Sequence, residues 1–396
     1  MPALAIDGGT PVRAEFLPYG RQSLDDDDIA AVAAVLRSDW LTTGPKVEEF
    51  ERVFAAAVGA KEAVAVSSGT AALHAAIFAL DIGPDDEVIV PAITFAASAN
   101  CVVYQGGRPV FADVDPDTLL LDPMRAEALV TPRTRAIVGV DFAGQPCDWD
   151  GLGGVARRHG LVSVDDACHA VGGSYRGKAV GSLADVNTFS FHPVKHITTG
   201  EGGIVTSDDP ELAGRMRIFR NHGITTDHRQ REVRGSWFYE MVELGYNYRM
   251  TDIQCALGMS QLAKLPGWVA RRREIAASYD RAFTDVPEVR PLGVRPEVEH
   301  AYHLYVVQLQ LEQLRVDRSR VFAALRAENI GVNVHYVPVH LHPFYQQHYG
   351  TGPGDCPVAE SAYERLLTLP LYPAMSDSDV SDVVEAMSKV LGEYRK

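Results

Sequence analysis

A lysine and an aspartate stand where two successive apolar segments end, and together they could perform amine chemistry. Lys195 comes shortly after the apolar segment 188–191, and Asp166 follows the apolar segment 161–164. A free lysine has a pKa of about 10.4, so a lysine that is nucleophilic near neutral pH needs burial or a covalent imine. Taken alone, a lysine is usually a solvated surface residue, so this interpretation depends on what lies beside it.

The sequence 67–70 (Ser-Ser-Gly-Thr) supplies a third element, because it follows an apolar strand and precedes the helical segment 71–77. The glycine lets a ligand approach the backbone, and the first helical turn presents unpaired N–H groups and a favourable dipole to an anion. The same pattern can be a simple helix cap. The chain contains neither a P-loop nor a Gly-x-Gly-x-x-Gly fingerprint after a strand, which disfavours ATPases and Rossmann dehydrogenases. A phosphate seat, an acid and a lysine at one pocket edge favour pyridoxal phosphate (PLP) chemistry.

The elements that must position these residues are short β-branched runs alternating with helical segments between about residues 25 and 210. This alternation is typical of an α/β fold with a mostly parallel sheet covered by helices. In such sheets, ligands bind beyond the carboxyl ends of the strands. The predicted strands span residues 63–66, 88–90, 136–140, 161–164, 188–191 and 203–206.

The C-terminal third of the chain differs in pattern. A long helix is predicted after Asp252, followed by a strand, a helix, a strand and a helix at 305–309, 318–328, 331–335 and 377–391. We expect a large domain over residues 1–260, which includes the N-terminal segment 1–24, and a smaller α/β domain over residues 261–396. The run Asp25–Asp28 is interpreted as a helix N-terminus, where carboxylates accept free N–H groups.

Composition excludes several classes of protein. The 396 residues carry a formal net charge of −15, which opposes binding to nucleic acid or to anionic membranes. No apolar run approaches the roughly 20 residues needed to span a bilayer, and no signal peptide is recognisable, so we expect a cytoplasmic protein. The five cysteines lack a Cys-x-x-Cys pair, and no metal site is predicted.

Several motifs, in order along residues 41–373, resemble the DegT/DnrJ/EryC1/StrS family of sugar aminotransferases. They are Asp-Asp-Ala-Cys-His-Ala at 165–170, Ser-Phe-His-Pro-Val-Lys-His-Ile-Thr-Thr-Gly-Glu-Gly-Gly at 190–203, Gly-Tyr-Asn-Tyr-Arg-Met-Thr-Asp at 245–252 and Val-His-Tyr-Val-Pro-Val-His at 334–340. The resemblance implies the type I aminotransferase fold, PLP as cofactor with pyridoxamine phosphate as intermediate, and a homodimer whose active sites lie at the subunit interface.

The resemblance also assigns roles to positions of this sequence. Lys195 matches the lysine that binds PLP as a Schiff base and moves the proton, where some sugar-dehydrating relatives have histidine. Asp166 matches the carboxylate that faces the pyridine nitrogen. The other cofactor-binding positions are Ser68, Gly69, Thr70 and Ser190 at the phosphate, Phe95 and His169 at the ring, and Asn247 reaching the phosphate from the second subunit. The expected substrate-binding residues are Thr43, His335, Tyr336 and His340.

Segments 140–144, 198–203 and 335–341 are most similar to enzymes that aminate C-4 of nucleotide-linked 4-keto-6-deoxy sugars, including the pseudaminic acid pathway type. The leading hypothesis is transfer of an amino group from L-glutamate to the C-4 ketone of a UDP- or dTDP-linked sugar. A cyclitol aminotransferase of aminoglycoside synthesis shares every cofactor motif and stays an alternative. A PLP-binding regulatory protein without turnover is a third hypothesis, disfavoured by the intact Lys195, Asp166 and Asn247. The sequence leaves the nucleotide and the sugar epimer open.

Overall fold

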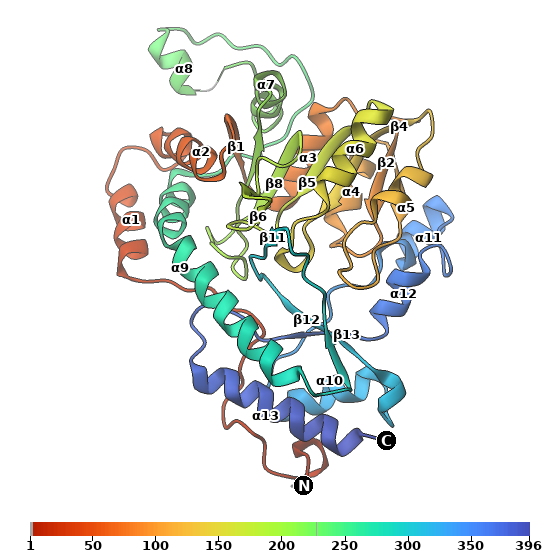
Figure 1. The fold of residues 1–396 in the computed structure, drawn as a ribbon. Coiled ribbons are helices and arrows are strands. Elements are labelled where there is room, and N and C mark those ends of the chain that lie inside the picture. The colour runs from red at the N-terminus through yellow and green to blue at the C-terminus, as the bar shows by residue number, and fades with distance from the viewer. Residues whose placement is uncertain (1–2, 227) are drawn as a thin grey trace.

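A seven-stranded sheet forms the centre of the larger of two lobes in the computed structural model, which describes residues 3–226 and 228–396 (Figure 1). The strand order is β1-β9-β8-β5-β4-β2-β3, and β9 alone runs antiparallel to its neighbours in this sheet. The strands are β1 (Glu62–Val66), β2 (Glu87–Pro91), β3 (Arg108–Ala112), β4 (Thr134–Val140), β5 (Val162–Asp166), β8 (Val186–Ser190) and β9 (Gly203–Ser207). The predicted mostly parallel α/β sheet is confirmed, although β3 was missed.

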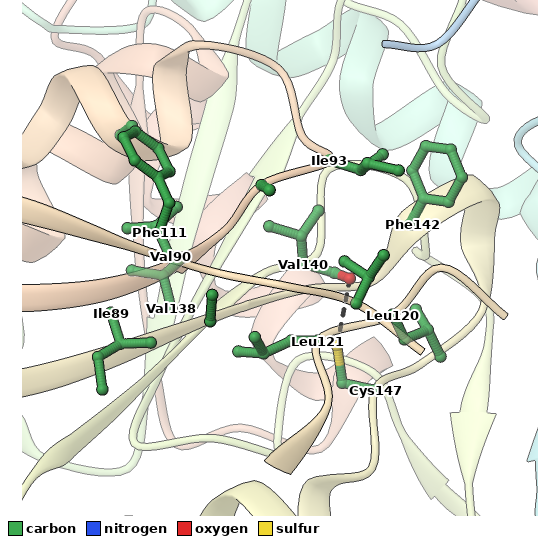
Figure 2. Packing of buried hydrophobic residues seen from close by; sticks show 14 of the residues in the cluster. Ile89, Val90, Ile93, Phe111, Leu120, Leu121, Val138, Val140, Phe142 and Cys147 are labelled. Carbon is green, nitrogen blue, oxygen red and sulfur yellow. Dashed lines mark hydrogen bonds between the residues drawn. The ribbon is translucent and has the colours of Figure 1, made fainter. Parts of the chain in front are cut away.

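Helices cover both faces of this sheet, which explains why its strands are apolar along nearly their whole length. On one face, α3 and α7 pack on the valines of β1, β8 and β9, and on the other, α2 and the first part of α9 pack on Phe189 and Phe191. Figure 2 shows a further part of the core, where side chains of β2 and β4 meet those of the loops that follow them. The helices of this lobe are α1 (Asp26–Leu36), α2 (Pro45–Val58), α3 (Gly69–Ala79), α4 (Ala97–Tyr104), α5 (Pro123–Ala128), α6 (Trp149–His159), α7 (Pro210–Phe219), α8 (His228–Val233) and the 3-10 helix η2 (Phe142–Gly144).

The smaller lobe is built on an antiparallel sheet of β10, β12 and β13, with α9 running into it from the larger lobe (Figure 1). A third, short sheet joins β11 to β6 and β7. The remaining elements are η1 (Ala5–Asp7), β6 (Ser174–Tyr175), β7 (Lys178–Ala179), α9 (Asp252–Phe283), β10 (Val289–Pro291), β11 (Val298–Glu299), β12 (Tyr305–Leu309), η3 (Leu311–Gln313), α10 (Arg318–Ala327), η4 (Val339–Leu341), α11 (Pro343–Tyr349), α12 (Pro357–Tyr363), β13 (Leu366–Leu369) and α13 (Asp377–Tyr394).

Polar side chains cap the first turns of α1 and α9. Asp25 caps α1 in a capping box with Asp28, and Thr251 and Gln254 form the same arrangement at the start of α9. One predicted strand was wrong: residues 331–335 form only an isolated bridge, between Asn333 and Thr368, and β13 supplies the strand instead.

The division of the chain into domains at residues 260 and 261 stays a prediction, and the structure adds two observations to it. That boundary falls inside the continuous helix α9. Leu4 and Leu17, from the segment assigned to the large domain, lie in the hydrophobic core of the smaller lobe with residues of α9, α10 and α13. The first described residues of the chain and its C-terminal helix α13 therefore both lie in the smaller lobe (Figure 1).

A fully buried carboxylate holds the N-terminal segment on the smaller lobe. Glu328 accepts the backbone N–H groups of Ala5 and Val12 at 2.8 and 2.9 Å, and it pairs with Lys389 at 2.9 Å. Replacing Glu328 by alanine should lower the free energy of unfolding by about 3–5 kcal/mol, because it leaves a buried ammonium group without its partner. Urea unfolding measures this, and the exposed Glu385→Ala variant on α13 should change stability by less than about 0.5 kcal/mol.

Candidate active site

Four of the residues singled out in the sequence lie at one edge of the central sheet. Ser68 follows β1, Asp166 ends β5, and Ser190 ends β8 with Lys195 five residues beyond it. Asp166 is the register partner of Thr188 on β8, so the ends of β5 and β8 are adjacent. The parallel strands β1, β5 and β8 all point their carboxyl ends to this edge, which is where such sheets place their ligands.

The start of α3 presents free backbone donors. Ser68 is its N-cap, and the Ser68 hydroxyl oxygen accepts the N–H of Ala71 at 3.0 Å. In the described structure, the N–H groups of Gly69 and Thr70 donate to no other group. A Cβ at Gly69 would lie 2.8 Å from Cβ of Ser190, so this position requires glycine for the approach of α3 to the end of β8.

Asp166 is almost fully buried, with 5 % of its surface exposed, and a residue of α4 forms a hydrogen bond with its carboxylate. The hydroxyl of Ser98 donates to Asp166 Oδ2 at 2.6 Å, and the N–H of Cys168 donates to Oδ1 at 3.3 Å. Ser98 is in turn 2.6 Å from the hydroxyl of Thr94. Ser98 was not predicted from the sequence, because its contact with Asp166 spans 68 positions.

Lys195 is half-buried, and its amine has no hydrogen-bond or salt-bridge partner within the described residues. Burial lowers the pKa of Lys195 below its ordinary value, while the neighbouring Cys168 and Asp166 act in the opposite direction. A lysine amine with a depressed pKa is a better nucleophile at neutral pH than a solvated one.

Aromatic and imidazole rings from both lobes meet beside these groups. The Tyr336 hydroxyl lies 3.2 Å from Nε2 of His169, and the Tyr336 ring is 6.0 Å from the ring of Phe95. The ring of His303 lies 4.4 Å from that of His169. Burial lowers the pKa of His169 well below its ordinary value, with Lys195 as the largest charged contribution, so the imidazole is neutral. Phe95 keeps 60 % of its surface exposed and is available to a ligand.

Two other predicted residues, His335 and His340, come from the smaller lobe and differ in their surroundings. His335 contacts the Thr368 hydroxyl at 2.8 Å and lies 5.5 Å from the ring of Tyr19, while Lys195 helps to lower its pKa to about 3 after the larger effect of burial. His340 is fully buried, with Nε2 2.9 Å from a carboxylate oxygen of Glu360, so the structure does not bring it to the others.

Thr43 and Asn247 lie on the surface around α7. Thr43 lines a cavity of about 110 Å³ together with Asn221 and Arg249. Asn247 is exposed, but the neighbouring Tyr248 carbonyl accepts the Ser67 N–H at 2.8 Å, which places Asn247 close to the start of the phosphate seat. Across residues 3–226 and 228–396, no group of three or more potential ligands is arranged to hold a metal ion.

A model of the DegT/DnrJ/EryC1/StrS aminotransferase family matches residues 22–388. The chain belongs to this family. The aminotransferase is 47% identical to the spore coat polysaccharide biosynthesis protein SpsC of Bacillus subtilis (strain 168), over 96% of this chain and 98% of that protein.

Solved structures agree with this assignment. The PLP form of the putative sugar aminotransferase Spr1654 from Streptococcus pneumoniae superposes with a TM-score of 0.89 at 34% identity, covering 96% of this chain and 99% of that one. Helicobacter pylori PseC, an aminotransferase involved in the biosynthesis of pseudoaminic acid, gives 0.89 at 32% identity, covering 96% and 100%. The expected type I fold and PLP-dependent sugar aminotransferase class are confirmed.

The described residues of this aminotransferase fit PLP. The free N–H groups at Gly69 and Thr70, next to the Ser190 hydroxyl, are a donor set for a phosphate. The unpartnered amine of Lys195 suits an aldehyde, and a buried carboxylate at Asp166 suits a protonated ring nitrogen. Within the part of the chain that the structure describes, no helix has the length and apolar character needed to cross a bilayer.

Proposed function

We propose that this aminotransferase moves the amino group of L-glutamate to the C-4 ketone of a nucleotide-linked 4-keto-6-deoxyhexose. The observation that carries the proposal is the convergence of Lys195, Asp166 and the start of α3 at one sheet edge. Relatives named for spore coat polysaccharide and pseudoaminic acid biosynthesis support an activated sugar as the acceptor. The net charge of −15 means that the anionic nucleotide must be held by local donors.

In this proposal, two side chains carry the chemistry. When bound, PLP supplies an electron sink that lets an amino group leave one carbon and join another. Lys195 Nζ would hold the cofactor covalently and, when free, would move a proton between the substrate carbon and the cofactor. Asp166 keeps the ring nitrogen protonated, and Ser98 fixes the carboxylate by its 2.6 Å hydrogen bond.

The cofactor ring and phosphate are held by the surrounding residues. Gly69, Thr70 and Ser190 would bind the phosphate, with Ser68 shaping the turn, and Phe95 and His169 would contact the ring. His335 and Tyr336 face the substrate from the smaller lobe. Thr43 and His340 stay predictions as substrate residues, because the contacts described above do not connect them with Lys195.

Gly69→Ala should weaken PLP binding at least about tenfold, because a Cβ 2.8 Å from Ser190 would move α3 away from the end of β8. Titration of the cofactor-free protein with PLP, followed by absorbance, gives the Kd. Gly83→Ala is the matched control, since no atom lies within 4 Å of its added Cβ. Equal Kd values for the two variants would contradict the assigned phosphate seat.

The acceptor is tested by substrate profiling with L-glutamate as donor. We expect conversion of UDP- or dTDP-4-keto-6-deoxyhexoses, with the new amine at C-4 shown by mass spectrometry and NMR. Turnover of an inosose and none of the keto-sugar nucleotides would replace the proposal by a cyclitol aminotransferase. Binding of PLP without turnover of any acceptor or of glutamate would favour a regulatory protein.

The same proposal includes a homodimer with shared active sites. Between residues 233 and 246, large apolar side chains are exposed, including Trp237 at 85 % and Val233 at 88 %. Exposed apolar side chains gathered in one segment are typical of a surface that another protein covers. The exposed Asn247 follows this segment directly, so a partner that covers it would bring Asn247 to a phosphate seat.

Mixing two inactive variants tests whether the two subunits of the dimer share their active sites. If Asn247 acts across the interface, Lys195→Ala and Asn247→Ala dimers that exchange subunits should regain up to about a quarter of wild-type activity, because half of the dimers are mixed and each carries one intact site. If Asn247 acts within its own subunit, mixing restores no activity. Sedimentation at the assay concentration confirms whether dimers form.

A further inference from the structure

Two more carboxyl groups lie behind Asp166, and the proposed chemistry uses neither. Asp141 directly follows β4, and Asp165 precedes Asp166 on β5. Both side chains are 0 % exposed. Gly139 is the register partner of Asp165, so Asp165 and Asp141, two positions after Gly139, belong to the same face of the sheet, opposite to Asp166.

Both carboxyl groups have oxygens without a hydrogen-bond partner among the described residues. Asp141 Oδ1 accepts the N–H of Cys147 at 2.8 Å and the indole N–H of Trp149 at 3.3 Å. Asp141 Oδ2 and both carboxyl oxygens of Asp165 have no partner in the described part of the chain, where neither group has a salt bridge. A buried carboxylate without donors is too costly to persist, so such a group takes up a proton.

The surroundings favour protonation of at least one of the two carboxyl groups. The groups that face the pair are the thiol of Cys147, the indole of Trp149 on α6, and Asn187 opposite Asp165 on β8, whose amide already bonds to backbone groups. The carboxylate of Asp166 lies on the opposite face of the sheet. Burial, with the charge of Asp166 in the same direction, raises the pKa of Asp141 to about 7. Burial and the two neighbouring carboxylates raise the pKa of Asp165 well above its usual range.

We propose that Asp141 and Asp165 are positioning residues that share one proton across the ends of β4 and β5, and whose single negative charge helps Asp166 to hold the cofactor's ring nitrogen protonated. The hydroxyl of protonated Asp165 donates to Asp141 Oδ2, which gives a partner to one oxygen of each carboxyl group. Below about pH 7 both carboxyl groups are protonated. As the pH rises through about 7, Asp141 releases its proton to solvent, and the proton that remains on Asp165 is the one that the two groups share. The inference rests on the proposed role of Asp166.

Infrared spectroscopy of the full-length protein in D2O detects the shared proton directly. At about pH 8, where ordinary carboxyl groups are ionised, we expect a protonated-carboxyl band that disappears in Asp165→Asn. In that variant the new amide donates to Asp141, so the hydrogen bond and the negative charge both remain. The exposed Asp39→Asn variant should leave the band unchanged. A wild-type spectrum without the band, or a band that survives in Asp165→Asn, would overturn the shared proton.

The role of the charge is tested by a double variant, Asp141→Asn with Asp165→Asn, which keeps an amide hydrogen bond but carries no charge. With PLP labelled with ¹⁵N in the ring, the pH at which the ring nitrogen loses its proton should fall by about one unit in the double variant, with about a tenfold lower kcat. The single Asp165→Asn variant should titrate like wild type. An identical titration in all three proteins would contradict the assigned role.

These experiments distinguish a failure of the shared-proton inference from a failure of the proposed amino transfer. Circular dichroism checks folding, and if the double variant does not fold, Asp165→Asn and its infrared band still decide whether the proton is shared. The infrared band does not depend on Lys195 or on turnover. A failure of the proposed amino transfer would therefore leave the acid pair testable, and loss of the band would leave the amino transfer untouched.

Discussion

Replacing Lys195 by alanine should lower kcat/KM for amino transfer by at least about 10⁴-fold, because the variant loses both the covalent link to the cofactor and the proton carrier. The half-buried position and the lowered pKa of this amine are the structural reasons for expecting so large an effect. Stopped-flow absorbance after addition of L-glutamate measures the first half of the reaction, and product formation measures the whole.

Lys178, an exposed lysine on β7, gives the matched control. Lys178→Ala should keep wild-type kinetics and stability, because its side chain is exposed to solvent. Substantial turnover by Lys195→Ala, with the cofactor still bound, would rule out the proposed mechanism.

Asp166→Asn should lower kcat by about 10³-fold, since a charge pair near 4 Å contributes roughly 4 kcal/mol at an effective dielectric of 20, or about three pKa units of the ring nitrogen. The amide keeps the shape of the side chain and can still accept from Ser98, so the loss reports on charge. Steady-state kinetics with L-glutamate and the ¹⁵N shift of the labelled ring measure it.

Ser98→Ala provides a graded comparison. It removes the 2.6 Å hydrogen bond to Asp166 but leaves the carboxylate in place, so kcat should fall by about tenfold or less. If Asp166→Asn cost no more than Ser98→Ala, Asp166 would not be the group that holds the ring proton.

The sequence predicted those parts of the site that depend on local pattern. Apolar β-branched runs located β1, β5 and β8 to within two residues at each end, and Ser68 was recognisable as a cap because capping is decided within one helical turn. The parallel order of these strands then places Asp166 and Lys195 together without any knowledge of distances.

Contacts between distant segments could not be predicted in this way. The Ser98 hydroxyl and the His303 ring reach Asp166 and His169 from elements whose relative placement only the packed fold sets. For His340 the motif predicted a contact with substrate, and local pattern did not show that its imidazole is fully buried against Glu360. Local pattern also gave no indication of the two unpartnered acids, because orphaned oxygens appear only once neighbouring strands are in place.

The central claim is that Lys195 carries the cofactor, and reduction of the PLP-loaded protein with borohydride tests it most directly. Peptide mapping by mass spectrometry should then find a stable pyridoxyl group on Lys195, and prior addition of excess L-glutamate should prevent the labelling. A label on another lysine, or no label in a protein that remains active, would contradict the account.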